Sequence, residues 1–418
     1  MKAAADPAGA LDLGPVRAAC QEAGVEFEDA GGVGGGPVAR PATEASLGTL
    51  VALLAERSRL SPIRLVPTGS GGQLHWCRPD ATLAPAAFVQ LSMGALLGDE
   101  PATGVVEYVP GDGTLTALAG ADLGVLRATV AEGGHRLTPA IFGSCTLGGV
   151  LASGRSGLDR HGFGPARHHL LGMRMIDGNG RHLRSGGRLV KNVTGFDLHR
   201  LHAGGRGIFG PIVEASMRLM PAPEAEQYLT SSPAASSTAA VELALAIRGA
   251  ARIREHGLFV RDRVVHVLLS GRGRQVEADR RRLEGMVDGL QEHQPGPGAE
   301  AFHLAGESRT AVRLSTVPSR TSGIVSQLEG SLGELSGAVI QPGVAQVDLP
   351  QELISGATGW PASLEAEVGI RGAVPEPLRS SLSATAAPAG PESRWTRRLV
   401  EAFDPSGLFQ TEGFPARS

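Results

Sequence analysis

A glycine-rich turn directly after an apolar, strand-like run is the most informative feature of this sequence. The run Ile63–Val66 precedes the segment P-T-G-S-G-G-Q-L, which spans residues Pro67–Leu74. Three glycines together with Ser and Thr let the backbone turn tightly and direct several N–H groups at one anion. The segment lacks the lysine of a nucleoside-triphosphate loop. It predicts either a phosphate-binding loop or an ordinary glycine-rich hairpin turn.

A second glycine cluster, Gly143–Gly154, has the sequence G-S-C-T-L-G-G-V-L-A-S-G. Thr146 is predicted to cap a short helix whose free N–H groups face a phosphate, and Gly148 and Gly149 would allow close approach. A glycine-rich contact between helices is the alternative. Combined with the first turn, the cluster favours a dinucleotide diphosphate held between two loops.

A third glycine segment, Gly205–Gly210, matches the formal pattern G-x-G-x-x-G. It follows a helix-like run, Phe196–His202, and leads into a predicted strand. A Rossmann fingerprint needs the order strand, turn and helix. We therefore do not interpret this segment as a dinucleotide-binding fingerprint.

The composition of the 418 residues excludes several functional classes. Hydrophobic residues make up 42%, charged residues 19% and aromatic residues 4%, and the formal net charge is −3. This balance is typical of a globular protein and argues against binding to nucleic acid or to an anionic membrane. Cys20, Cys77 and Cys145 are scattered without a C-x-x-C pair, so neither an iron–sulfur cluster nor any other metal site is predicted. We find no apolar run that would enter a membrane and expect a cytoplasmic protein, which a membrane-bound partner could still hold at a membrane.

The sequence pattern predicts an α+β fold in four parts. Residues 1–37 form an N-terminal appendage, and residues 38–223 form a first domain with glycine-rich connections. A Ser/Ala/Pro stretch, Ser231–Thr238, reads as a linker inside the next part, residues 224–390, where two successive strand–helix units predict a ferredoxin-like cap domain. Residues 391–418 are predicted to contain a last helix that packs back onto the first domain.

Hydrophobic periodicity places the main elements of these parts. Predicted strands lie at 105–109, 114–119, 169–176, 211–220, 257–260, 264–270 and 311–315. Apolar residues at helical spacing occur at Leu47, Leu50, Val51 and Leu54, at Leu123, Leu126 and Val130, at Val276, Leu283, Met286 and Leu290, and at Ile324, Leu328, Leu332 and Leu335.

No catalytic base can be named from the residues alone. His199, His202 and Lys191 are the best guesses, because they lie between glycine clusters. The polar stretch that contains Lys191 could contact a cofactor phosphate or a carboxylate, or could brace its own loop.

The order of these motifs resembles the FAD-binding oxidases of the vanillyl-alcohol oxidase/PCMH type. The resemblance rests on P-T-G-S-G-G-Q-L, G-S-C-T-L-G-G-V-L-A-S-G, M-I-D-G-N-G-R, G-G-R-L-V-K-N-V-T-G-F-D-L, G-I-F-G-P-I-V-E-A-S-M-R-L and the tail A-F-D-P-S-G-L-F-Q-T-E-G. The V-K-N-V-T-G-F-D-L run and the short cap are similar to the branch of the glycolate oxidase E subunit. The likeness covers about 38–223 and the tail.

The resemblance implies a PCMH-type domain of two subdomains with FAD buried between them. Its implied cofactor-contacting residues are Pro67, Thr68, Gly69, Ser70, Gly71, Gly72, Gln73, Leu74, Gly143, Ser144, Cys145, Thr146, Gly149, Ser153, Gly154, Gly210 and Ile212. Gln73 stands where covalent members often carry His, so a non-covalent flavin is expected. Cys145 lies near the position of a thioether link in bicovalent relatives; the alternative is a small buried hydrophobe.

The catalytic 2-hydroxy-acid dehydrogenases of this fold carry an H-x-G-D-G-N-x-H run in the cap, which this sequence lacks. The resemblance therefore implies an FAD-binding subunit of a glycolate-oxidase-like complex that oxidises a small 2-hydroxy acid. Its implied partners are a homologous catalytic flavin subunit and an iron–sulfur subunit. The alternatives are a standalone FAD-linked oxidoreductase of an alcohol or hydroxy acid and a non-redox scaffold that keeps FAD for stability.

Overall fold

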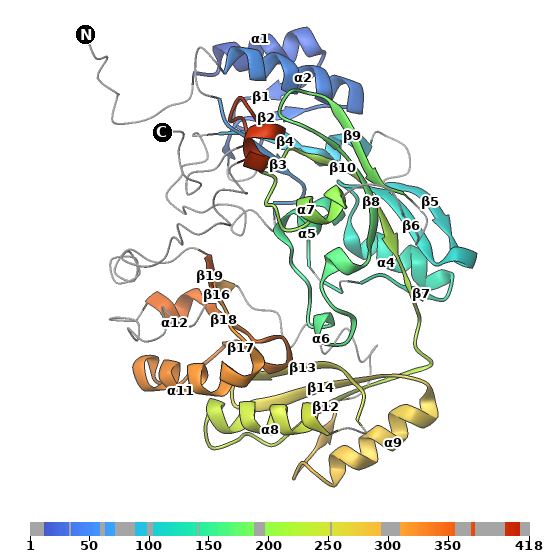
Figure 1. Cartoon of the computed structure of the whole chain (residues 1–418), viewed down its shortest axis with the longest axis vertical. Coiled ribbons are helices and arrows are strands. Elements are labelled where there is room, and N and C mark those ends of the chain that lie inside the picture. The colour runs from blue at the N-terminus through green and yellow to red at the C-terminus, as the bar shows by residue number, and fades with distance from the viewer. Residues whose placement is uncertain are drawn as a thin grey trace.

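The structure is a computed structural model of the chain, and mixed helices and sheets form three successive bodies in it (Figure 1). It describes residues 12–32, 35–58, 63–71, 88–97, 103–138, 140–141, 143–187, 197–250, 253–293, 310–355, 369–372 and 398–409. We call residues 12–97 the first lobe, residues 103–223 the second lobe and residues 225–372 the cap. The predicted α+β class is confirmed.

The first lobe is a four-stranded sheet in the order β1-β2-β4-β3, covered by two helices. Its elements are α1 (Gly14–Ala23), β1 (Glu26–Glu28), β2 (Val38–Arg40), α2 (Glu44–Arg57), β3 (Leu65–Thr68) and β4 (Val89–Ser92). A capping box starts α2, because Thr43 Oγ1 accepts from the Ser46 N–H and Ser46 Oγ from the Thr43 N–H. The predicted apolar stripe of α2 is confirmed: Leu47, Leu50 and Leu54 are fully buried.

The second lobe is a five-stranded antiparallel sheet in the order β5-β6-β10-β8-β9. Its strands are β5 (Val105–Val109), β6 (Thr114–Leu118), β8 (Leu170–Ile176), β9 (His182–Gly186) and β10 (Ile212–Arg218), and its helices are α4 (Leu123–Glu132), α5 (Leu147–Ser153), α6 (Arg160–Phe163) and α7 (Leu198–His202). The strands predicted in this region are confirmed. A small pair, β7 (His135–Arg136) with β11 (Met220–Pro221), leads toward the cap.

The cap is an eight-stranded antiparallel sheet in the order β15-β12-β14-β13-β17-β18-β16-β19. Its strands are β12 (Ala225–Thr230), β13 (Glu255–Arg261), β14 (Val264–Gly271), β15 (Gln291–Glu292), β16 (Thr310–Ser315), β17 (Val339–Gln341), β18 (Gln346–Pro350) and β19 (Gly369–Gly372), and its helices are α8 (Ser237–Gly249), α9 (Gly273–Glu284), α11 (Thr321–Leu332) and α12 (Gln351–Ser355). Each half runs strand, helix, strand, strand, helix, strand with the ferredoxin-like strand order. The cap is therefore two such units joined where β13 pairs with β17, and not the one unit that the sequence predicted.

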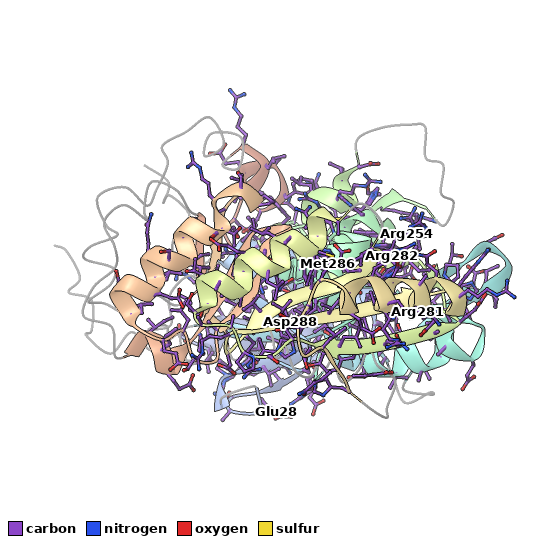
Figure 2. The ribbon with its side chains drawn as sticks, turned by 90° about the horizontal axis from the view of Figure 1, so that it is seen from below. Glu28, Arg254, Arg281, Arg282, Met286 and Asp288 are labelled. Carbon is purple, nitrogen blue, oxygen red and sulfur yellow. The ribbon has the colours of Figure 1, made fainter. Side chains whose placement is uncertain are left out.

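Two local expectations in the cap differ from the structure. The stretch Ser231–Thr238 is not a linker between bodies; it connects β12 to α8, whose first turn is capped by Ser236. Helix α9 stops at Glu284, so Met286 lies outside it and is 42% exposed. Gly285 and Gly289 interrupt the helical pattern after α9, and the side chain of Val287 lies in the core of the cap. Figure 2 shows the helical face of the cap with Arg281 and Met286 labelled.

The opposite face of the cap sheet meets the second lobe. Leu158 joins Tyr228, Phe259 and Leu268 in one buried cluster. An ion pair links Arg136 Nη2 to Glu226 Oε1 at 2.6 Å. No helix among the described residues combines the length and apolarity that crossing a bilayer requires.

Candidate functional site

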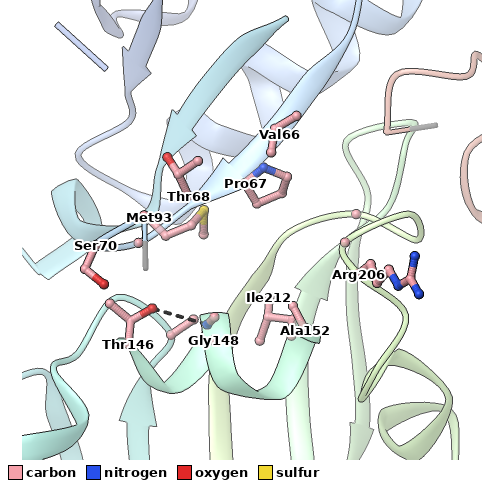
Figure 3. A pocket seen from close by; sticks show the side chains of 16 residues that line it. Val66, Pro67, Thr68, Ser70, Met93, Thr146, Gly148, Ala152, Arg206 and Ile212 are labelled. Carbon is pink, nitrogen blue, oxygen red and sulfur yellow. Dashed lines mark hydrogen bonds between the residues drawn. The ribbon is translucent and has the colours of Figure 1, made fainter. Parts of the chain in front are cut away.

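A narrow cleft lies between the two lobes (Figure 3). The end of β3 and the turn after it form one wall, while the start of α5 and the turn before β10 form the other. Its lining residues are Val66, Pro67, Thr68, Gly69, Ser70, Gly71, Met93, Ala119, Thr146, Gly148, Gly149, Ala152, Arg206, Gly207, Gly210 and Ile212. The tertiary structure thus brings the three glycine-rich segments of the sequence together.

The turn after β3 presents bare backbone to this cleft. A Cβ atom on Gly69 would lie 2.2 Å from Thr146 Oγ1, so the two loops approach as closely as glycine permits. Gly71 has a φ of +81°, a conformation that favours glycine. The backbone N–H groups of Gly69, Ser70 and Gly71 donate to no other described residue, so they are available to an anion. The Ser70 hydroxyl donates to the Ser144 carbonyl at 3.0 Å and ties the loops together.

The start of α5 does not have the role that the sequence suggested. Thr146 does cap the helix, since its Oγ1 accepts from the Gly149 N–H at 3.2 Å. However, the Leu147 N–H donates to Ala121 O and the Gly148 N–H donates to Ala119 O. The first three N–H groups of α5 are therefore used inside the protein, and the expectation that they face a phosphate is wrong. Two of them donate to carbonyls of the segment that follows β6, and the third donates to the Thr146 cap.

The segment Gly205–Gly210 contributes to the cleft although it is no Rossmann fingerprint. Helix α7 precedes it and strand β10 follows it, which confirms the order inferred from the sequence. A Cβ atom on Gly210 would lie 1.9 Å from Ile176 O, so the backbone passes directly over β8. Sequence reasoning missed Arg206 and Gly207 here, because it tested this glycine pattern against a single motif.

A second and larger cleft, of about 780 Å³, opens where the second lobe faces the cap. The clefts share Arg206, and the predicted residues Ser153 and Gly154 line the second one. Residues from the cap, including Gln346, close its other side. The two clefts together make an extended space that runs from between the lobes to the cap.

Several predicted residues line neither cleft. Gly143 and Ser144 lie on the loop before α5, outside both linings, and Cys145 is 1% exposed within the core of the second lobe. Its Sγ lies 3.8 Å from Ile141 O, which fits the alternative of a small buried hydrophobe. The predicted residues Gly72, Gln73, Leu74 and Lys191 lie outside the described residues.

The two histidines suggested as bases belong to the packing of the second lobe. His199 Nδ1 lies 3.0 Å from Ser185 Oγ, and His202 contacts the rings of Phe209 and Phe403. Burial lowers the pKa of both imidazoles, which favours their neutral forms. Neither lines a cleft. In the described part of the chain, no three His, Cys, Asp or Glu side chains are grouped to hold a metal ion.

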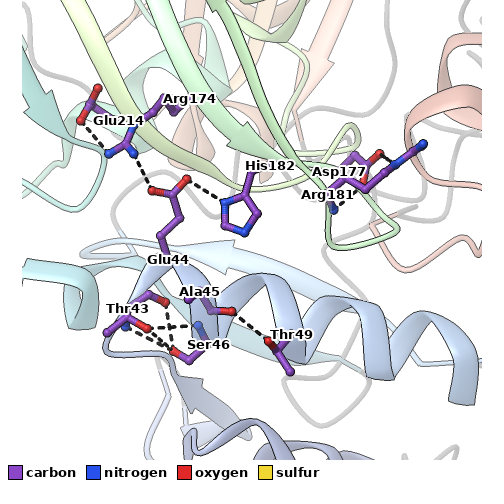
Figure 4. Close-up of polar contacts among 10 residues, drawn as sticks. All are labelled: Thr43, Glu44, Ala45, Ser46, Thr49, Arg174, Asp177, Arg181, His182 and Glu214. Atoms are coloured by element: carbon purple, nitrogen blue, oxygen red, sulfur yellow. Dashed lines mark hydrogen bonds and ion pairs between the residues drawn. The ribbon is translucent and has the colours of Figure 1, made fainter.

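An ion-pair network joins the first lobe to the second lobe (Figure 4). Glu44, at the start of α2, lies 2.7 Å from Arg174 Nη1 and 3.0 Å from His182 Nδ1, both in the second lobe. Arg174 also pairs with Glu214 at 2.8 Å. These contacts join α2 of the first lobe to β8 and β9 of the second lobe.

Comparison with known families identifies the type of domain to which most of the cleft residues belong. Residues 37–186 match the family described as FAD binding domain. Residues 37–186 thus belong to an FAD-binding domain of the PCMH type. The match covers the turn after β3 and the start of α5, and it ends before β10 and the turn that precedes it.

Relatives of the FAD-binding domain include three curated proteins. The chain is 40% identical to the glycolate oxidase subunit GlcE of Escherichia coli over 129 residues, which are 30% of this chain and 37% of the relative. It is 31% identical to a D-2-hydroxyglutarate dehydrogenase of Xanthomonas citri over 163 residues, covering 38% and 34% of the two chains. It is 29% identical to the glycolate oxidase subunit GlcD of Bacillus subtilis over 170 residues, covering 40% and 34%. The matches thus span little more than a third of each relative.

Solved structures share the fold across nearly the whole chain. A xylooligosaccharide oxidase from Myceliophthora thermophila superposes with a TM-score of 0.68 at 15% identity, covering 97% of this chain and 100% of the other. An alkyldihydroxyacetonephosphate synthase superposes with a TM-score of 0.60 at 14% identity, covering 90% and 76%. These likenesses establish the fold, including the cap.

The residues of the cleft fit FAD, the cofactor of this domain. Six glycines line the cleft and leave backbone exposed, and the unused N–H groups of Gly69, Ser70 and Gly71 suit a diphosphate. The apolar side chains of Val66, Met93 and Ile212 offer surfaces for flat rings.

Proposed function

We propose that this chain is an FAD-dependent oxidoreductase that oxidises a small 2-hydroxy acid. The observation that carries this proposal is the glycine-lined cleft between the two lobes. Most of its lining lies in the region that matches the FAD binding domain, and it continues at Arg206 into a second cleft under the cap. Two of its relatives are named as glycolate oxidase subunits and a third as a hydroxyglutarate dehydrogenase, which supports hydroxy acids as the substrate class.

Different residues of the cleft bind different parts of the cofactor in this proposal. The N–H groups of Gly69, Ser70 and Gly71 hold the cofactor diphosphate, and the backbone around Gly210 and Ile212 borders the rest of the dinucleotide. The bound isoalloxazine supplies a two-electron acceptor for the oxidation of an alcohol to a carbonyl. The buried Cys145, which lines neither cleft, favours a non-covalent cofactor.

We further propose that the chain works in a complex and passes its electrons to a partner subunit. The names of the GlcE and GlcD relatives, both subunits of a glycolate oxidase, support this arrangement. A homologous catalytic flavin subunit and an iron–sulfur subunit are the partners expected from the sequence.

The test starts with the purified chain. We expect the protein to show the absorbance spectrum of a bound flavin. Acid treatment should release this flavin into solution, because the cofactor is held without a covalent bond. Anaerobic addition of glycolate and of larger 2-hydroxy acids should then bleach the flavin, either in the chain alone or after addition of co-purifying subunits. A colourless chain that takes up no FAD contradicts flavin binding, and a flavin that stays oxidised with every acid and partner contradicts the redox function.

A further inference from the structure

The described lining of the second cleft contains arginines and no carboxylate. Six arginines face it from both bodies, and none of its described lining residues is Asp or Glu; the arginines are Arg155, Arg160, Arg167, Arg200, Arg206 and Arg313. Guanidinium groups that converge on one space repel one another unless an anion lies between them. The lining is thus arranged for a ligand with negative charge.

Pairing inside the protein neutralises only part of this charge. Arg313 is held by Asp348 in a bidentate pair, with N–O distances of 2.5 and 2.6 Å. Arg200 reaches Asp197 at 3.4 Å, and both side chains are about half exposed. Arg167 and Arg206 make no ion pair or hydrogen bond through their side chains within the described part of the chain. At least two guanidinium charges therefore remain for a ligand.

Arg206 is placed at the junction of the clefts by a strained backbone. Its φ is +56°, which a non-glycine residue rarely adopts, although glycines flank it on both sides. Its N–H donates to Ala152 O, and the neighbouring Gly204 N–H donates to Leu151 O, so the turn is fixed to the end of α5. Figure 3 shows its side chain beside the first cleft. Such strain at a cleft residue is typical of a functional position.

The cap adds an unsatisfied hydrogen-bond acceptor to the same cleft. Gln346, on β18, is 6% exposed, and its buried Oε1 has no hydrogen-bond partner among the described residues. It lies opposite Ser315 in the pairing of β16 with β18, and both residues line the cleft. A buried amide oxygen without a donor is costly, so a ligand hydroxyl is a fitting partner for it.

We infer that the second cleft selects 2-hydroxy acids that carry a second anionic group, a carboxylate or a phosphate. This inference rests on the proposed function, since it names the substrate class of the same site. Arg206 binds one anionic group, Arg167 and Arg200 bind the other, and Gln346 accepts a hydrogen bond from the substrate hydroxyl. A monoanion such as glycolate leaves one of these cationic positions unfilled.

The experiment is equilibrium dialysis of the FAD-loaded full chain against four radiolabelled probes: glycolate, malate, succinate and 3-phosphoglycerate. Dialysis counts bound label whether or not the flavin is reduced, and the flavin spectrum of the same samples reports the redox function separately. We expect malate, 3-phosphoglycerate or both to bind about ten-fold more tightly than glycolate, with an advantage that declines as salt rises. Tight binding of malate would indicate that the second anionic group of the preferred ligand is a carboxylate. Tight binding of 3-phosphoglycerate would indicate that it is a phosphate.

Two variants separate the roles of the cleft residues. Arg206→Gly removes the charge and also relieves the strained φ, so the chain should unfold at the same or a higher temperature while dianions bind no better than glycolate. Gln346→Leu should abolish the preference for malate over succinate and leave succinate binding unchanged. Arg281→Gln on the exposed side of α9 is the matched control, and its affinities should equal those of the parent chain.

Equal affinity of the parent chain for glycolate and the dianions, or no binding of either, overturns the inference even if the flavin is bleached by glycolate. An Arg206→Gly chain that loses FAD but keeps the affinity for dianions also overturns it, because Arg206 would then serve the cofactor diphosphate. Tight dianion binding by a chain whose flavin is never reduced supports the binding site and contradicts only the proposed oxidation.

Discussion

Gly69 and Thr146 meet where the two lobes close, and their contact leaves no space for a side chain. Thr146 cannot simply turn away from a Cβ atom 2.2 Å from its Oγ1, because the same oxygen caps α5. The loss of such a cap costs about 1 kcal/mol. Residue 69 therefore sets the distance between the two loops that border the cofactor.

Gly69→Ala should push the two loops apart and lower the FAD content of the purified protein, measured by the ratio of flavin to protein absorbance. Gly187→Ala is the matched control, because a Cβ atom on Gly187 meets nothing within 4 Å. Equal FAD content in the two variants would contradict the role of the loop contact.

Asp159 is a buried carboxyl at the start of α6, and it is only 4% exposed. Its Oδ2 accepts from the Ala140 N–H at 2.8 Å, whereas Oδ1 has no partner among the described residues. Desolvation by burial outweighs this hydrogen bond and raises the pKa of Asp159 from 3.8 to about 6.

The raised pKa predicts a loss of stability as pH rises. Between about pH 4 and pH 6 the folded chain binds more protons at this site than the unfolded chain, so the free energy of unfolding falls, by about 3 kcal/mol in all. Above pH 6 the penalty stays constant. Asp159→Asn should remove this fall in urea titrations at pH 4, 5 and 7, whereas Asp288→Asn on the exposed face of the cap should retain it. Parallel profiles for the parent chain and Asp159→Asn would refute the assignment.

At the scale of an element, residues 398–409 close the first lobe from the far end of the sequence (Figure 1). The Leu65 N–H donates to Leu408 O at 2.7 Å, so this segment lies against the start of β3. Asp404 turns the chain by accepting from the N–H groups of Leu408 and Phe409, and burial raises the pKa of its carboxyl. The segment supports β3 directly before the turn that borders the cofactor.

Phe409→Ala should therefore destabilise the chain strongly. The Phe409 side chain is 2% exposed in the core of the first lobe, so its truncation should lower the free energy of unfolding by about 3 to 5 kcal/mol. Phe409→Leu keeps most of the apolar volume and should cost clearly less. Urea denaturation measures both variants, and equal losses would show that packing of the ring is not what anchors the segment.

At the scale of the whole molecule, a buried ion pair attaches the cap to the second lobe. Arg136 pairs with Glu226, and its other terminal nitrogen donates to Ser270 Oγ at 3.2 Å. The exposed fractions of the Arg136 and Glu226 side chains are 17% and 15%. Removing either residue would therefore leave the charge of the other one unpaired and largely shielded from water.

Arg136→Met should lower the free energy of unfolding by about 3 kcal/mol and make the junction between lobe and cap more sensitive to protease. The double variant Arg136→Met with Glu226→Met should recover a large part of that loss, because no unpaired charge remains. A double variant as unstable as the single one would show that the pair acts through packing and not through charge.

The sequence predicted the elements of this fold better than their assembly. Strands such as Val105–Val109 and helices such as Glu44–Arg57 carry their own periodicity, so local pattern identified them. The sequence did not reveal that the cap contains two ferredoxin-like units, because strands β15 and β17 have only two and three residues. Such short strands show no alternation of apolar and polar residues. The functions of Gly72, Gln73 and Leu74 and the location of the protein stay predictions.

The sequence by itself determined that the chain carries glycine-rich turns suited to a phosphate, since glycine content and strand periodicity are local properties. Tertiary structure decided which backbone groups of those turns remain free. The N–H groups of Gly69–Gly71 have no partner among the described residues, whereas those at the start of α5 donate to Ala119 O, Ala121 O and Thr146 Oγ1. It also decided that Arg206 and Gln346, 140 positions apart in the sequence, line one cleft. Long-range packing creates such proximity, and no spacing along the chain records it.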